Sequence, residues 1–595
     1  MGMDLQRKGL LYRLVLSGIV IGVIIYMLYY GDQKEGYHVD EVYSYGLANS
    51  EYLPFMHFGE HDYNVKDWMK EYATGNEFGD IFKNVVKDFK LLKEVDFDFK
   101  SSVLYRDYLV ALANSADTRT TTWVSGEDYL HYVSTSPENR FNYASVYYNQ
   151  RGDVHPPLFY ILLHTICSFF VESFSKWYGL ILNMIFMLLS MRMLFKLCNR
   201  LYDDKFLSAA VMALYGFSCG FMTTALFLRM YAMLTFFVLS SCYIHLALAD
   251  EEFELTKRRR RQIAIITLLG FLTHYYFVIY AIGIAVVCCL WMIFKKKNSS
   301  LLRYICTLTT TAVIGLCVWP FAIKHVFFCY RGKGSFQALA QVEVYLIKIK
   351  LMIEQLFGSM LQGKWWIWVL AASVLGLMAL ICRRKNISWG RVSLISIPAI
   401  LYVLLVAQIV PFYTERYVMC IFPFVCITLM GCIYYTVKIC CERLAKVSVC
   451  EKWMWKHGEK VLMFFVVVAT GLFLFLNNCY TNMPGYLFPE GQEAVELPEN
   501  TDCIFVLPDG DWNESAEEST VFAQARKVGV VYESDINVLS AGYTRQRGDF
   551  LMVLIQKNMD EEVVLEQVKN ALGVEDLTEI SRSMGGSAVR ILLGD

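Results

Sequence analysis

Long apolar runs recur along this 595-residue chain and constrain its fold more than any other feature. The first extends from Leu14 to Tyr30, and the others cover 156–172, 177–197, 206–226, 230–249, 262–275, 277–294, 302–322, 364–382, 391–410, 417–440 and 461–478. A helix of about 20 apolar residues crosses the ~30 Å hydrocarbon core of a bilayer. Hydrophobic residues make up 56% of the chain, more than a soluble globular protein carries. The sequence therefore predicts an all-α polytopic membrane protein.

Four basic clusters indicate which runs cross the bilayer and in which direction. They follow apolar runs and lie at 257–261, 295–297, 383–385 and 438–446. Basic residues gather on the cytoplasmic side, and all four clusters fall on that side only if the run 156–172 does not cross. We therefore expect 156–172 to form an interfacial or re-entrant helix on the outer face. About eleven crossings of the plasma membrane remain, with a cytoplasmic N-terminus and an extracytoplasmic C-terminus.

This topology divides the chain into four parts. They are the first transmembrane helix (1–30), an extracytoplasmic loop (31–176), a transmembrane bundle (177–478) that includes an outer loop (323–363), and an extracytoplasmic domain (479–595). Arg7, Lys8 and Arg13 precede the first run, and no cleavage site follows it. We therefore expect a retained first span and not a removed signal peptide.

The part 479–595 has the pattern of a small α/β domain. Candidate strands are Cys503–Leu507, Val528–Tyr532, Phe550–Ile555 and Ala588–Leu592, and a helix is expected at Glu561–Leu572. In the outer loop, Gln341–Gly358 mixes apolar with charged residues. That mixture fits either a helix lying in the membrane interface or a plain connecting loop.

Charge and cysteine content narrow the possible partners. The formal net charge is -1, which gives no support to a nucleic acid partner. The eighteen cysteines include no CxxC pair and lie mostly in apolar runs. Neither a disulfide framework nor a zinc knuckle is expected from that distribution.

Asp40 and Glu41 form an acidic pair about ten residues beyond the first apolar run. Neighbouring residues on a helix point about 100° apart, so only one of the pair can face a given pocket. One interpretation makes Asp40 a general base. The other is a solvated acidic helix start, which the helix dipole favours.

His155 lies in the motif Asp153-Val154-His155-Pro156-Pro157-Leu158, which opens the run that is not expected to cross. Proline suits the first turn of a helix. The free amides of a helix N-terminus beside a histidine can bind an anion. A capped helix start without a ligand is the alternative.

Three cationic or cationisable residues recur at the outer ends of predicted spans. Arg229 stands two residues before Tyr231, His274 lies in the hairpin between two runs, and Arg416 directly precedes Tyr417. Taken singly, each can be a boundary residue whose charge reaches the membrane surface. Together, at one depth, they can bind a phosphate or pyrophosphate at the outer leaflet.

These motifs resemble the GT-C superfamily of integral membrane glycosyltransferases, and within it family 39, the protein O-mannosyltransferase-like group, together with related bacterial lipid A aminoarabinose transferases. The matching elements are Asp40-Glu41 after the first span, Asp153-x-His155-Pro156-Pro157-Leu158, Arg229-Met230-Tyr231 and Arg416-Tyr417 before a late span. The hairpin His274-Tyr275-Tyr276 is similar to the bacterial branch. The resemblance covers about residues 10–440, and the tail 479–595 lies outside it.

The resemblance implies a GT-C fold and a glycosyltransferase that uses a polyprenyl-phosphate sugar as its donor. Asp40 would take the acceptor hydroxyl proton during an inverting displacement at the anomeric carbon. The implied donor phosphate ligands are Arg229, Arg416, His274 and His155, with Glu41, Asp153, Tyr231 and Tyr417 in support. Some members of the superfamily use a divalent metal ion, for which Asp40, Asp153 and His155 are the candidate ligands. No cofactor is otherwise implied, and the acceptor would be a glycan, lipid or protein of the cell envelope.

Three other classes of function stay open. A lipid-linked polysaccharide polymerase or ligase would also be polytopic and bind a lipid pyrophosphate. A flippase or transporter of lipid-linked sugars needs polar residues near mid-span, whereas the candidates here lie at one boundary. A membrane-anchored binding protein would use the tail 479–595 as its sensor.

Overall fold

The computed structural model describes residues 2–54, 123–341, 343–361, 365–383, 389–444, 467–468, 471–472, 483–488, 495–509, 518–541, 543–585 and 588–595. The chain forms two compact units. The helical unit comprises Met1–Lys34, Val154–Phe159 and Gly179–Leu487. The mixed unit comprises Glu35–Asp153, Tyr160–Tyr178 and Phe488–Asp595.

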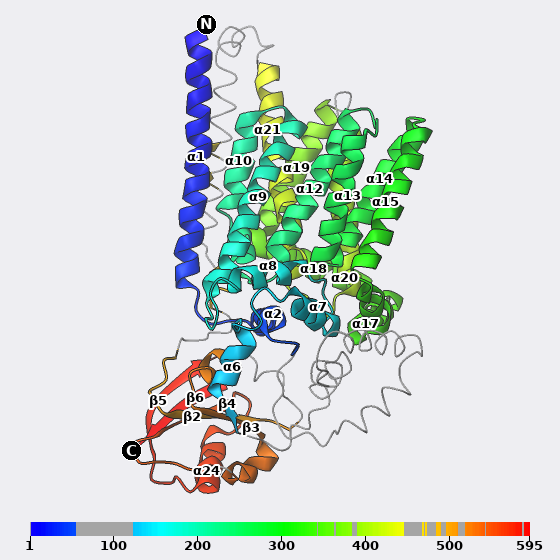
Figure 1. Ribbon diagram of the computed structural model, residues 1–595. Helices are drawn as coiled ribbons and strands as arrows, with labels where there is room; N and C mark the ends of the chain where they lie inside the picture. Colours follow the sequence, from blue (N-terminus) through cyan, green and yellow to red (C-terminus); the bar gives the residue numbers. More distant parts are fainter. Residues whose placement is uncertain are drawn as a thin grey trace, which may run out of the picture. The chain divides into compact units, whose positions relative to one another are not determined.

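Long apolar helices build the helical unit (Figure 1). Within the described ranges, seven helices are long and apolar enough to cross a membrane, and two bent pairs raise the number to nine. The helices that supply these seven spans are α1 (Gly2–Gln33), α9 (Lys176–Tyr202), α12 (Tyr231–Asp250), α14 (Tyr276–Phe294), α15 (Asn298–Val318), α20 (Trp389–Ile409) and α21 (Phe422–Leu444). The chain is thus a multi-pass membrane protein, as the apolar runs predict.

Some predicted crossings differ from a single straight helix. The run 206–226 forms two helices, α10 (Lys205–Gly216) and α11 (Cys219–Leu226), which are bent by 57°. Ser218 causes the break, because its Oγ accepts the Phe221 N–H and so caps the start of α11. The helix α13 (Lys257–Thr273) covers the run 262–275. The run 461–478 lies largely outside the described residues, so the number of eleven crossings stays a prediction.

The short helix α8 (Leu158–Cys167) occupies the run 156–172. Ten residues give a helix of about 15 Å, which is too short to cross the hydrocarbon core. This length agrees with the expectation that the run does not span the membrane.

The predicted outer loop is largely helical. It contains α16 (Phe321–Ile323), a π-helical turn (Lys324–Phe328), α17 (Tyr330–Ala340) and α18 (Tyr345–Leu361), followed by α19 (Trp365–Arg383). The helix α18 replaces the plain loop that was the alternative at 341–358. Gln408 of α20 holds α17 in place, because its Nε2 donates to the carbonyls of Ala338 (2.6 Å) and Gln341 (3.1 Å).

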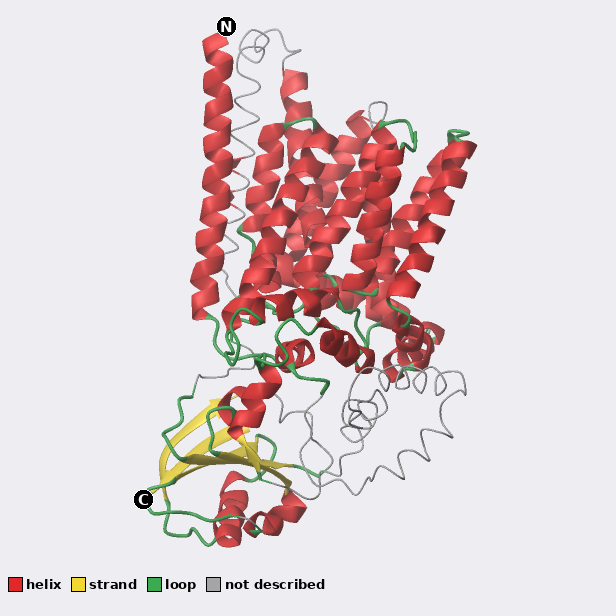
Figure 2. Ribbon diagram, in the orientation of Figure 1, coloured by secondary structure: helices red, strands yellow, loops and turns green. Residues whose placement is uncertain are grey.

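A six-stranded sheet with the order β1-β3-β2-β4-β6-β5 lies in the mixed unit (Figure 2). The strands are β1 (Val124–Ser125), β2 (Thr501–Leu507), β3 (Lys527–Tyr532), β4 (Phe550–Gln556), β5 (Thr578–Gly585) and β6 (Ala588–Gly594). β3, β2 and β4 pair in parallel, and the outer strands pair antiparallel. The helix α24 (Glu561–Leu572) has the predicted bounds.

Both faces of this sheet are covered, so its central strands are buried along their whole length. One face packs against α24, through Val564 and Val568, and against the 3-10 segment Glu533–Ser540. The other face packs against Tyr129 of α6 (Gly126–Val133) and Phe522 of α23 (Ser519–Phe522). A small α/β domain is therefore confirmed in the C-terminal part.

The first loop contributes a strand and a helix to this domain. Val124 pairs with Val528 at the edge of the sheet. The ring of Tyr129 lies 5.0 Å from that of Phe522. Gly126 leaves no room for a side chain, because a Cβ there would lie 1.9 Å from the Ala525 carbonyl oxygen. The segment 123–133 and the tail thus fold as one body.

Candidate functional site

Four of the predicted site residues belong to the helical unit and lie next to helix ends. Arg229 precedes α12, His274 follows the last residue of α13, and Arg416 lies in the 3-10 turn Glu415–Tyr417 that leads into α21. The start of α12, the end of α13 and the start of α14 share one end of the bundle, because consecutive helices run in opposite directions. His155 lies in the segment Val154–Phe159 of the same unit.

His274 is at the centre of this group. Its ring centroid lies 5.6 Å from that of His155, 5.6 Å from that of Tyr231 and 4.8 Å from that of Tyr276. Its Nδ1 accepts the backbone N–H of Tyr276 at 3.0 Å. A neutral His274 therefore carries its proton on Nε2 and can donate it to a ligand.

His274 has three basic residues as electrostatic neighbours. Burial lowers the pKa of His274 well below its usual value, and the neighbouring His155, Arg229 and Arg416 lower it further. Arg229 is 4% exposed. We call Arg229, Arg416, His155 and His274 the cation cluster. Arg229, His155 and His274 are buried and Arg416 is half-buried, and a set of this composition suits an anion with several oxygen acceptors.

Aromatic rings surround the cluster. The guanidinium of Arg416 lies over the ring of Tyr417, with 5.2 Å from Cζ to the ring centroid. Tyr417 in turn lies 5.6 Å from Tyr276. Tyr276 has two charged arginine neighbours, Arg331 of α17 and Arg416. Sequence reasoning missed Arg331, because the outer loop has no continuous apolar run from which its depth could be inferred.

A chain of hydrogen bonds fixes the hairpin that carries His274. The Nε1–H of Trp319 donates to the hydroxyl of Tyr275 at 2.9 Å. The Tyr275 hydroxyl and Nδ1 of His325 are 2.8 Å apart. The Tyr275 hydroxyl thus joins Trp319 to His325. Trp319 and His325 are buried, so the hairpin has a rigid backing.

The three acidic candidates lie in the mixed unit. The helix α2 (Val39–Asn49) begins with a capping box in which the Glu41 carboxylate accepts the His38 N–H at 2.8 Å. Glu41 is fully buried in this role. Asp40 keeps 22% of its side chain exposed, with its carboxylate 3.9 Å from His38 Nδ1. The two carboxylates thus have different surroundings, and the expectation that one of them faces a pocket stays a prediction.

Asp153 ends the helix α7 (Tyr143–Gly152), where its N–H donates to the Gln150 carbonyl at 3.2 Å. It is a charged neighbour of the buried phenol of Tyr132.

The helix α2 is itself held by buried hydrogen bonds, because Asn49 Nδ2 donates to the Val133 carbonyl at 2.8 Å. The grouping of Asp40, Glu41 and Asp153 with the cation cluster stays a prediction.

A metal centre receives no support from the described part of the chain. Within those residues, no three His, Cys, Asp or Glu side chains gather closely enough to hold an ion. The candidate ligands Asp40 and Asp153 belong to the mixed unit and His155 to the helical unit. The proposed set of metal ligands therefore stays a prediction.

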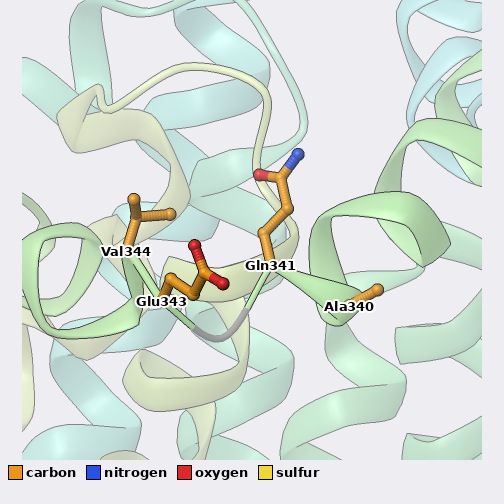
Figure 3. Close-up of a pocket in the computed structure, with 4 residues that line it drawn as sticks. All are labelled: Ala340, Gln341, Glu343 and Val344. Atoms are coloured by element: carbon orange, nitrogen blue, oxygen red, sulfur yellow. The ribbon is translucent and has the colours of Figure 1, made fainter.

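A pocket of about 510 Å³ lies between α17 and α18 (Figure 3). Ala340, Gln341, Glu343 and Val344 line it. None of these residues belongs to the cation cluster. We assign the pocket no part in the site, because its lining offers one carboxylate and no cationic side chain.

The fold and the site together define a multi-pass membrane protein with a cationic, aromatic site at one end of its helical bundle and an additional α/β domain. No protein-family model matches the chain, and no curated protein does.

Solved structures with a similar course of the chain include ArnT from Cupriavidus metallidurans bound to undecaprenyl phosphate. It is 10% identical, over 74% of this chain and 87% of ArnT, with a TM-score of 0.40. ArnT in the apo state is 11% identical over 80% and 94%, also with a TM-score of 0.40. An oligosaccharyltransferase from Archaeoglobus fulgidus, tethered with an acceptor peptide, is 10% identical over 62% and 55%, with a TM-score of 0.35.

Proposed function

We propose that this protein is a GT-C glycosyltransferase of the family 39 type, acting on the outer face of the membrane. It moves a sugar from a polyprenyl-phosphate donor to an acceptor hydroxyl. The observation that carries the proposal is the cation cluster, which gathers two arginines and two histidines from four separate parts of the chain at one end of the bundle. A lipid phosphate reaches such a site from within the bilayer.

The reaction is a single displacement with inversion. The acceptor oxygen attacks the anomeric carbon and forms the new glycosidic bond, while the bond from that carbon to the phosphate oxygen breaks. The lipid phosphate leaves with the bonding electrons, and Asp40 accepts the proton of the acceptor hydroxyl. Because the leaving group is already a good one, no strong acid is needed.

Charge develops on the phosphate oxygens as the bond breaks, and the cation cluster stabilises it. Arg229 and Arg416 supply fixed positive charges and several N–H donors. Neutral His274 donates its Nε2–H. The hairpin and turns that carry these groups are held by the bonds described above, so little reorganisation is required during the reaction.

An assay of the purified protein with a panel of polyprenyl-phosphate sugars tests this proposal. The expected result is release of free polyprenyl phosphate that depends on an acceptor. Arg416→Ala should slow the release by at least about tenfold, because a hydrogen bond to a charged group contributes about 1.5–3 kcal/mol. Arg258 lies at the opposite end of α13 from His274 and is exposed, so Arg258→Ala is the matched control. Absence of release from every donor would contradict the proposal, and release of a diphosphate would indicate a polymerase or ligase.

A further inference from the structure

The segment Met483–Leu487 follows the last predicted span and packs onto the residues that present the cation cluster. The ring of Tyr486 stacks on that of Phe227, with centroids 3.8 Å apart and planes 12° from parallel. Phe227 also stacks with Tyr231, at 5.5 Å and 14°. Phe227 is therefore the shared member of a stack of three aromatic rings.

Three contacts hold this segment in register. Lys34, at the end of the first stretch of the helical unit, is 1% exposed and donates from Nζ to the Tyr486 carbonyl at 2.6 Å. The Gly485 N–H donates to Thr223 Oγ1 at 3.0 Å. A Cβ at Gly485 would lie 2.9 Å from Thr223 Cγ2 and 3.1 Å from Glu415 Oε1. Glycine thus lets the segment lie close to Thr223 and to Glu415, the residue that precedes Arg416.

The aromatic stack is connected to Arg229 through the backbone of Phe227. The Phe227 carbonyl accepts the Arg229 N–H at 2.7 Å and the Asn183 Nδ2–H at 2.6 Å. This tight turn sets the direction in which the Arg229 side chain extends from the backbone. The ring of the same Phe227 is set by Tyr486, so a shift of Tyr486 would move the turn.

The stack also reaches His274. The ring of Tyr231 lies 5.6 Å from that of His274, and Tyr231 opens the helix α12. The Tyr486 ring therefore supports two members of the cation cluster, one through the Phe227 backbone and one through the Tyr231 ring.

We propose that Tyr486 is a positioning residue for the donor phosphate, whose ring holds the Phe227 turn and thereby places Arg229 and Tyr231. The inference rests on the proposed function, because it takes a lipid phosphate as the ligand of the cluster. It also assigns a role to the connection between the last span and the tail, which is then part of the site.

Binding of polyprenyl phosphate to the full-length protein tests the role of Tyr486. Tyr486→Ala should weaken binding roughly three- to tenfold, in line with the contribution of an aromatic pair. Tyr486→Phe keeps the ring and should bind within about threefold of wild type. Met483 is 66% exposed in the same segment, so Met483→Ala is the matched control and should bind as wild type does.

Turnover separates positioning from a loss of fold. In Tyr486→Ala the donor KM should rise by the same factor as the dissociation constant, with kcat less affected, and Tyr486→Phe should restore both. Unchanged binding in Tyr486→Ala would overturn the inference and leave the proposed function intact. Binding by wild type without transfer from any donor would overturn the proposed function alone. If wild type does not bind polyprenyl phosphate, both are wrong.

Discussion

Single residues in this protein owe their roles to their local partners. Asp40 and Glu41 are adjacent and chemically alike, yet the Glu41 carboxylate is buried in the capping box of α2 while Asp40 remains partly exposed. His274 is neutral because burial and its basic neighbours disfavour a further charge. The residue type alone does not distinguish these roles. The neighbouring groups of each side chain do distinguish them.

Replacement of Asp40 should separate chemistry from binding. Asp40→Asn should lower kcat by about 10²–10⁴-fold, because the acceptor hydroxyl loses its general base, while the donor KM stays near the wild-type value. Glu127→Gln is the matched control, since Glu127 is an exposed carboxylate of α6 that has no part in the proposed site. Steady-state kinetics with a purified donor provide both constants. Full activity in Asp40→Asn would exclude Asp40 as the base.

The pH dependence of donor binding should not involve His274. Its pKa is lowered from the usual value of about 6.5, so the folded protein keeps His274 neutral as the pH falls from 8 to 6. The donor is a phosphodiester and keeps one negative charge over this range. The profile of donor KM against pH should therefore have the same shape in wild type and in His274→Gln. A transition near pH 6.5 that disappears in His274→Gln would contradict the neutral assignment.

Secondary-structure elements bring together residues that are distant in the sequence. The helices α12, α13, α14 and α21 bring distant residues to one end of the bundle, and the helix α17 adds Arg331. In the mixed unit, β1 and α6 from the first loop complete a domain whose remaining strands come from the tail. Elements from the first loop and from the tail are thus both needed to form this domain.

The contact between α6 and the tail can be tested at Gly126. Gly126→Ala places a Cβ against the Ala525 carbonyl and should destabilise the domain by about 1–3 kcal/mol. Backbone amides of β3 should then exchange hydrogen roughly 10- to 100-fold faster. Glu127→Ala changes the neighbouring exposed residue and should leave exchange within about twofold. Unaltered exchange in Gly126→Ala would show that α6 and the tail fold independently.

At the scale of the whole molecule, the sequence could predict those features that have a strong periodic signal. The apolar runs predict the long helices, short continuous apolar runs predict β2, β3, β4 and β6, and the helical spacing of apolar residues predicts α24. The positions of the runs predict that Arg229, His274 and Arg416 lie at one depth of the bundle, whereas their lateral distance depends on how the helices pack.

Other features have no such signal. β1 has two residues, and β5 is an exposed edge strand whose polar residues, such as Glu579 and Arg582, hide its period. Ser218 breaks a run whose length and composition suit one continuous span. Tyr486 reaches Phe227 only through tertiary packing. The pairing of β1 and the stacking of Tyr486 depend on residues far away in the chain, which a local pattern does not reveal.

We propose that the cation cluster binds a lipid phosphate. The affinity of the protein for polyprenyl phosphate is the measurement that tests this binding. The dissociation constant would be measured for wild type, for the double variant Arg229→Ala/Arg416→Ala and for the control Arg258→Ala. Loss of two hydrogen-bonded charges should weaken binding by about 100-fold or more, while Arg258→Ala should bind as wild type does. Equal affinity in the double variant and in wild type would contradict the account.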